Sequence, residues 1–146
     1  MDFAYKYPRM LVTVDALVFL IDSSQQFPKI LLIQRKNQPF KDSFALPGGF
    51  VEMDELLCNA AKRELFEETG LQGVELNQLA TFDNINRDPR DRNICIAYYG
   101  FTTLENSQIK GGDDAKNAVW VSLNNLPPLA FDHSEIIKFA RNKLDI

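Results

Sequence analysis

Residues 49–71, GFVEMDELLCNAAKRELFEETGL, carry the strongest structural signal in the chain. The turn residues Pro47, Gly48 and Gly49 lead into this stretch. Asp54 is a good N-cap, and Gly70 is the kind of residue at which helices usually stop. We therefore expect a helix over residues 55–69, joined to the preceding strand by a tight glycine turn.

The glutamates of this helix lie on one side. At about 100° per residue, Glu64 and Glu68 fall at or near the apolar stripe, and Glu67 lies alongside Glu64. Like charges at i,i+4 cost roughly 0.2–0.5 kcal/mol, and anions in the last turn oppose the helix dipole by roughly 0.3–1 kcal/mol. One interpretation is a solvated surface helix. The other is a hard divalent cation such as Mg²⁺, which favours carboxylates and substrate phosphates.

Features beside the glutamates favour the metal. A backbone carbonyl of the Gly-Gly turn can approach the same cation because glycine leaves room for it. Glu55 and Arg63 lie two turns apart and could brace the loop against the helix.

The rest of the chain predicts one domain, residues 1–146, built on a mixed sheet. Residues 10–21 and 29–34 are apolar runs separated by a polar turn, which indicates a hairpin. Asp132 caps a final helix that runs to about Leu144. Further strands are expected at residues 44–46, 79–85, 93–101 and 118–123. One internal and one terminal helix on such a sheet indicate an α+β protein or an α/β/α sandwich.

Composition limits the function classes. The net charge of −4 and pI near 5.0 argue against polymeric nucleic acid as a partner. Two cysteines outside any CxxC pair and one histidine supply too few ligands for zinc. The apolar segment at residues 11–21 is too short to span a membrane, and Thr13 and Asp15 interrupt it. We therefore expect a cytoplasmic protein with reduced thiols, and no membrane partner.

The pattern of Gly49, five residues, Glu55, seven residues and then residues 63–71 (RELFEETGL) resembles the Nudix box at every fixed position. The resemblance implies that Glu64, Glu67 and Glu68, with the carbonyl of Gly48, hold one or more Mg²⁺ ions, with Mn²⁺ as the alternative. It makes Arg63 part of the catalytic helix with a mainly structural role. It also implies a Nudix-like α/β/α sandwich that covers essentially the whole chain.

The resemblance implies hydrolysis of a phosphoanhydride bond by a water whose proton goes to a carboxylate. The base varies within this family between a box glutamate and an acidic residue on a later loop. Asp113 and Asp114, in a Gly-Gly-Asp-Asp turn, are the later candidates. The same residues also suit a plain hairpin turn, and both interpretations stay open.

Outside the box the chain is similar to the ADP-ribose pyrophosphatases of NAD metabolism. This similarity implies cleavage of ADP-ribose to AMP and ribose 5-phosphate. It rests on residues 7–9 (YPR), 12–15 (VTVD), 87–90 (RDPR), 112–115 (GDDA) before Trp120, and 129–133 (LAFDH).

Several side chains outside the box could bind such a substrate. Arg35 follows a strand and could reach a phosphate, or it could be a solvated charge. Arg87 and Arg90, with Arg92, could bind phosphate or ribose, or pair with Asp88 and Asp91 in a solvated loop. Phe131, His133 and Tyr5 could face adenine, although packing at a helix start or a loose terminus would also explain them.

Other functions remain open. A nucleoside triphosphate pyrophosphatase would carry the same box. A non-catalytic ADP-ribose-sensing module is the alternative from another class; regulators of that kind carry a DNA-binding winged helix, and only about a dozen residues follow the last capping signal here. A binding-only scaffold fits poorly with a complete set of glutamates. The resemblance also suggests a homodimer, sometimes with exchanged N-terminal strands.

Overall fold

The computed structural model describes residues 2–22, 28–109 and 118–146. Asp113 and Asp114 lie outside the described residues. Two long strands, β1 (Leu11–Leu20) and β6 (Asn93–Thr102), run parallel at the centre of the sheet. No helix within these ranges has the length and apolar character needed to cross a bilayer.

The remaining strands extend this pair into a mixed sheet. β5 (Asn77–Phe82) lies antiparallel to β6, while β2 (Lys29–Gln34) and β4 (Gly48–Phe50) both lie antiparallel to β1. The sheet is completed on β2 by β3 (Phe44–Ala45) and β7 (Val119–Ser122). The predicted hairpin is confirmed, because Phe19 pairs with Ile30.

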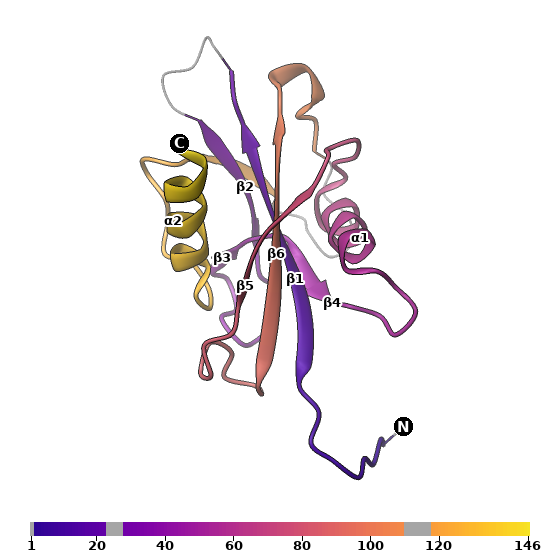
Figure 1. Cartoon of the computed structure of the whole chain (residues 1–146). Coiled ribbons are helices and arrows are strands. Elements are labelled where there is room, and N and C mark those ends of the chain that lie inside the picture. Colours follow the sequence, from indigo (N-terminus) through magenta and orange to yellow (C-terminus); the bar gives the residue numbers. More distant parts are fainter. Residues whose placement is uncertain (1, 23–27, 110–117) are drawn as a thin grey trace.

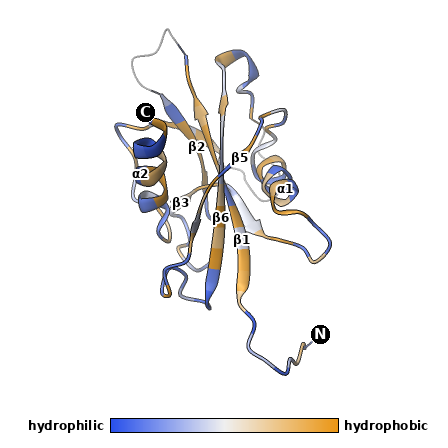
Figure 2. Cartoon of the chain, viewed as in Figure 1, coloured by the Kyte–Doolittle hydropathy of each residue, from blue (hydrophilic) through white to orange (hydrophobic). Residues whose placement is uncertain are grey.

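Helices cover the two faces of the sheet, α1 (Leu57–Thr69) on one and α2 (His133–Leu144) on the other (Figure 1). The apolar run of β1 serves both layers because successive side chains of a strand point to opposite faces. Val14 and Val18 pack in the core under α1, and Leu17 and Phe19 pack in the core under α2. The predicted α/β/α sandwich is confirmed, and Figure 2 shows its apolar residues concentrated along the central strands.

The entry into α1 differs from the prediction. The helix begins at Leu57, its N-cap is Leu56 in an extended conformation, and no side chain caps it. The carboxylate of Glu55 instead accepts a bond from the backbone N–H of Glu52 at 3.2 Å and binds Arg63, so it holds a loop rather than a first helical turn. Gly70 ends the helix as expected, with φ of 76°.

Two other predicted boundaries shift. The strand expected at residues 79–85 is β5, two residues earlier at its start and three at its end. Gly48 and Gly49, expected as a turn, begin strand β4, and Gly48 pairs with Asp15 of β1. This pairing brings the glycines against the sheet, next to the C-terminal turns of α1.

Candidate active site

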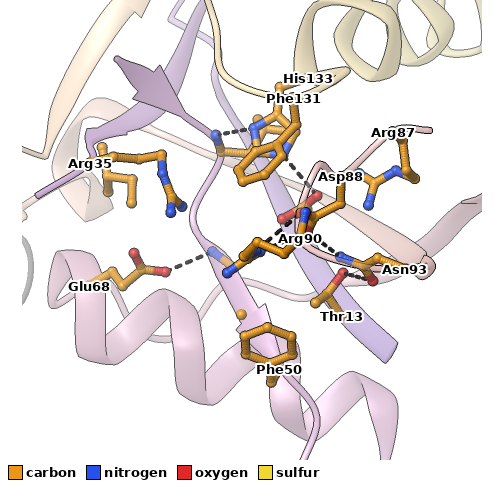
Figure 3. A pocket seen from close by; sticks show the side chains of 15 residues that line it. Thr13, Arg35, Phe50, Glu68, Arg87, Asp88, Arg90, Asn93, Phe131 and His133 are labelled. Atoms are coloured by element: carbon orange, nitrogen blue, oxygen red, sulfur yellow. Dashed lines mark hydrogen bonds and ion pairs between the residues drawn. The ribbon is translucent and has the colours of Figure 1, made fainter. Parts of the chain in front are cut away.

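A pocket of about 180 Å³ lies where β4, the last turn of α1, the 83–92 loop and the start of α2 meet (Figure 3). Its walls carry carboxylates, guanidinium groups and one exposed aromatic ring. The residues that decide its chemistry are Asp15, Arg35, Gly48, Gly49, Glu68, Arg87, Asp88, Arg90, Phe131 and His133. The pocket is smaller than the roughly 300 Å³ or more of typical ligand sites. Two hollows extend it, one beyond Phe131 and one along Arg35 to Asn37.

Arg63 braces the loop against α1. Its Nε lies 2.7 Å and its Nη2 2.9 Å from the carboxylate of Glu55, and Nη2 also donates to the carbonyl of Phe50 at 3.1 Å. Its Nη1 donates to Glu64 at 2.9 Å and Glu67 at 3.2 Å. Hydrogen bonding to Glu55, followed by Glu64, raises the pKa of Arg63 despite some burial. The brace inferred from the spacing of Glu55 and Arg63 is thus confirmed.

Glu68 lies at the glycine turn. Its Oε1 accepts the backbone N–H of Gly48 at 2.7 Å. The pKa of Glu68 is raised to about 8, mainly by burial and also by the charges of Glu64 and Asp15, while the Gly48 amide and Arg35 oppose this shift. This carboxylate is therefore held close to other negative groups in a desolvated place.

Glu64 faces the same turn from the other side. A Cβ added to Gly49 would lie 2.5–2.8 Å from the Glu64 carboxylate, so any larger residue there would displace this carboxylate. Burial raises the pKa of Glu64, although Arg63 opposes it. Glu67 differs, because half of its side chain is exposed (50%). The structure brings Glu64 and Glu68 together at residues 48–49 and leaves Glu67 at the outer edge.

The donor chemistry of this turn fits a hard cation. Within the described ranges, no group of three or more His, Cys, Asp or Glu side chains is already arranged to hold a metal ion. Two desolvated carboxylates beside a glycine backbone nevertheless supply oxygen ligands only, which suits Mg²⁺ or Mn²⁺ rather than zinc. The raised pKa values of both glutamates are what a nearby cation would reverse.

A buried polar network lies behind the turn. Asp15 Oδ2 accepts a bond from the Cys95 thiol at 3.0 Å and lies 3.2 Å from His133 Nε2. The N–H of Leu46 donates to His133 Nδ1 at 3.0 Å, which assigns the imidazole proton to Nε2. Burial raises the pKa of Asp15, but His133 and Cys95 outweigh it and the net shift is downward. His133 is buried, so its packing role, rather than a surface for adenine, is the one the structure supports.

Asp15 also limits the space available at residue 48. A Cβ on Gly48 would collide with Asp15 Oδ1 and the carbonyl of Val14. The glycine turn is thus held between Asp15 below and the glutamates of α1 beside it.

The loop arginines are paired rather than solvated. Arg90 makes a two-point bond to Asp88 at 3.0 and 2.7 Å, and the Asp88 side chain is fully buried (0% exposed). Burial raises the pKa of Asp88, but bonds from Arg90 and Asn93 lower it to about 2 overall. Thr13 in turn donates to Asn93 at 3.0 Å. These bonds fix Arg90 in the pocket wall (Figure 3).

Arg87 has a different partner from the one expected. It binds Asp132, at the start of α2, through two bonds of 3.0 and 2.7 Å, and its side chain is 3% exposed. Asp132 is the N-cap residue of α2 as predicted, but its side chain makes no capping bond, because this carboxylate binds Arg87 instead. Arg87 still lines the pocket, but as a buried member of its wall.

Phe131 lies close to two cations. The Cζ atom of Arg35 lies 4.9 Å and that of Arg90 5.6 Å from the centre of its ring. Arg90 also lies 5.2 Å from the ring of Phe50. Such contacts contribute roughly 0.5–2 kcal/mol each, depending on exposure. Burial, and then the neighbouring charge of Arg90, lower the pKa of Arg35.

Two sequence candidates lie elsewhere. Tyr5 is exposed on the N-terminal segment, where it contacts Arg9 at 3.9 Å. Arg92 donates to the carbonyl of Asp83. Neither of them lines the pocket.

Sequence reasoning missed Asp15, Asp88 and Asn93. A signal for the first was present, since Asp15 interrupts an otherwise apolar strand. A buried polar residue needs hydrogen-bond partners, so an aspartate inside a core strand is a candidate site residue.

The chain resembles known proteins over nearly its full length. Residues 11–140 match the family model of the NUDIX domain. An ADP-ribose pyrophosphatase from Methanocaldococcus jannaschii is 46% identical over 132 residues, which is 90% of this chain and 73% of that protein. An ADPR responsive transcriptional repressor, NtrR, from Acinetobacter baylyi is 38% identical over 143 residues, and the match covers 95% of this chain but only 56% of the repressor.

A solved structure agrees with the fold. The NUDIX domain of Shewanella oneidensis NrtR, complexed with ADP ribose, superposes with a TM-score of 0.86 at 33% identity. The match covers 94% of this chain and 90% of that one.

The raised pKa of Glu68 predicts a stability effect. A carboxyl whose folded pKa of about 8 exceeds its ordinary value near 4.5 makes the folded state lose stability as pH rises through that interval. In EDTA, we expect Glu68→Gln to raise the melting temperature at pH 8 by several degrees relative to the parent, and to do so much less at pH 5. Added Mg²⁺ should stabilise the parent more than the variant.

Thermal denaturation across this pH range measures the difference. Glu75→Gln, at an exposed glutamate between α1 and β5, is the matched control and should leave the melting curves unchanged. A Glu68→Gln protein that melts below the parent at pH 8 in EDTA would show that the carboxylate stabilises the fold.

Proposed function

Because the chain belongs to the Nudix family and is a Nudix hydrolase, we propose that it hydrolyses ADP-ribose to AMP and ribose 5-phosphate. The observation that carries this proposal is the pocket in which the carboxylate of Glu68 faces the cationic side chains of Arg35 and Arg90. That arrangement suits a diphosphate with a nucleoside on one side and a sugar on the other. The relative from M. jannaschii, described as an ADP-ribose pyrophosphatase, supports the choice of substrate.

A divalent cation, Mg²⁺ or Mn²⁺, belongs to this proposal. Glu64, Glu68 and the backbone of Gly48 would hold it, with Glu67 at the exposed edge. When bound, it neutralises diphosphate charge and lowers the pKa of a water.

The carboxylates would take the proton of the attacking water. Glu68 suits this role because its carboxylate lines the pocket, where its Oε1 is held by the Gly48 amide. Asp113 and Asp114 remain the other candidates for the base. Arg63 holds Glu64 and Glu67 in place through its bonds, so it contributes by position.

The arginines would hold the phosphates. Arg90 is fixed by Asp88, and Arg35 donates through Nε to the carbonyl of Pro39 at 2.8 Å, so each guanidinium keeps donors for a ligand. Preorganised cations of this kind stabilise the charge that spreads over the transferring group.

A sensing role is the second candidate. The similarity to the repressor from A. baylyi favours it, since the same fold there serves a response to ADP-ribose. A sensor would bind the nucleotide without turning it over, whereas a nucleoside triphosphate pyrophosphatase would release pyrophosphate from triphosphates.

A substrate panel separates these functions. With Mg²⁺, we expect ADP-ribose to give AMP and ribose 5-phosphate with a kcat/KM at least about tenfold above NADH, diadenosine polyphosphates and nucleoside triphosphates. Chromatography of the products provides the measurement. If triphosphates are preferred, the substrate assignment fails but the hydrolase remains. Tight binding of ADP-ribose without any turnover would instead establish the sensor.

The glutamates should be essential for turnover. We expect Glu68→Gln to lower kcat by about 10²-fold or more, and Glu64→Gln to lower it less, because both lose an oxygen ligand and Glu68 also loses its basicity. Circular dichroism should show an unchanged fold. The exposed Glu52→Gln is the control. Near-normal turnover by Glu68→Gln at saturating Mg²⁺ would contradict the metal assignment.

We also propose a homodimer. The N-terminal segment extends away from the domain (Figure 1), and it exposes Phe3, Tyr7 and Met10 to 71%, 69% and 57%. Apolar side chains grouped in this way are typical of interaction surfaces. Light scattering at micromolar concentration should give twice the chain mass of 16.7 kDa. A mass of one chain would overturn this proposal.

A further inference from the structure

The loop that carries Phe131 is fixed on both sides. Ala130 donates its N–H to the carbonyl of Phe44 at 2.8 Å, and Leu129 forms a bridge with the same residue of β3. On the other side, Asp132 binds Arg87, and the imidazole of His133 binds Leu46 and Asp15. These ties leave residue 131 little freedom to choose its own backbone conformation.

Phe131 adopts a backbone conformation that bulky residues avoid. Its φ is 53°, in the left-handed region, where glycine or asparagine is the usual occupant. A strained residue of this kind persists when its surroundings determine it, and such residues concentrate at functional sites. The strained backbone at residue 131 therefore indicates that the phenylalanine side chain has a functional role.

The ring of Phe131 has little surface left for a nucleobase. Arg35 and Arg90 both lie within cation–π distance of it. Phe40 lies 4.8 Å and His133 5.4 Å away, measured between ring centres. Because four neighbours already contact the ring, the stacking of adenine on it is disfavoured.

The same contacts give the ring another task. Arg35 and Arg90 carry like charges and come from separate segments, the loop directly after β2 and the 83–92 loop. In the view of Figure 3, they enter the pocket from different sides, and the Phe131 ring lies close to both. An aromatic face attracts both guanidinium groups, so it holds Arg35 near Arg90, whose own position Asp88 fixes.

We propose that Phe131 is a positioning residue that holds Arg35 and Arg90 at the spacing of two adjacent phosphates, so that the pocket selects diphosphates over monophosphates. The inference deepens the proposed function and rests on the same pocket. Two fixed cations bind a ligand that contacts both more tightly than a single phosphate, which reaches only one of them. Without the ring, Arg35 would move relative to Arg90, which Asp88 holds, and the second contact would lose its advantage.

The test compares two nucleotides that differ by one phosphate. Calorimetry in EDTA measures the affinities of ADP and AMP without turnover. We expect the parent to bind ADP about tenfold or more tightly than AMP, and Phe131→Leu to reduce this ratio to about threefold or less. Leucine keeps the Cβ and thus the backbone strain, so the change isolates the ring. Phe131→Tyr keeps the aromatic face and should retain the parent ratio.

A matched control uses the same substitution elsewhere. Phe139 is a partly exposed ring on α2 that contacts Phe82 at 5.5 Å, and Phe139→Leu should leave the ratio unchanged. Kinetics with ADP-ribose supply a second measure, in which Phe131→Leu raises KM about tenfold and lowers kcat much less. If Phe131→Leu does not fold, Phe131→Met, which keeps the volume without the aromatic face, takes its place.

The outcomes are distinct. An unchanged ratio in Phe131→Leu, an equal loss in Phe131→Tyr, or a parent that binds ADP and AMP alike would each overturn the inference. A parent that prefers ADP through Phe131 but leaves ADP-ribose intact would uphold the inference and refute the proposed hydrolysis.

Discussion

The bond from the Gly48 amide to the Glu68 carboxylate, 2.7 Å long, joins the two parts of the molecule on which the site depends. It places the end of α1 directly against strand β4. The approach is possible because residues 48 and 49 have no side chains: a Cβ on the first would strike Asp15, and one on the second would strike Glu64. The glycines thus allow three carboxylates from two layers to meet around a few backbone atoms.

The carboxylates around this turn differ in whether an arginine neutralises their charge. Glu55, Asp88 and Asp132 each face a guanidinium at 2.7 Å, so their burial is offset by a strong ion pair. Glu68 accepts a backbone amide instead, and its pKa rises to about 8. The fold supplies arginines to these other acids and only an amide to Glu68, so a cation bound at this turn would stabilise the ionised form of Glu68. The stability lost in this way is the usual cost of a preorganised site.

Local spacing made half of this site predictable. The positions of Arg63, Glu64, Glu67 and Glu68 follow from one helix, in which residues three and four apart share a side. The glycines before it and Gly70 after it fixed the helix to within two residues. The error at its start arose because Glu55 was taken for the first helical residue, whereas its carboxylate is engaged by Arg63 and Glu52 outside the helix.

The other half depends on contacts between distant segments. Asp15 and Cys95 are 80 residues apart in the sequence, and they meet because β1 runs beside β6. Arg87 and Asp132 are 45 residues apart, and they meet because α2 begins next to the 83–92 loop. No spacing rule relates such positions, so the sequence left Arg87 equally suited to ribose and to a solvated loop.

The same dependence explains the geometry of Phe131. Its φ of 53° has no cause within the string LAFDH. It follows from the ties that Phe44, Arg87 and Asp15 impose on the neighbouring residues, and these come from three other segments. The polar network behind the pocket thus fixes the position of the Phe131 ring, and the guanidinium groups that the ring contacts line the front of the pocket. A change in the network should therefore reach the substrate through Phe131 without touching a catalytic carboxylate.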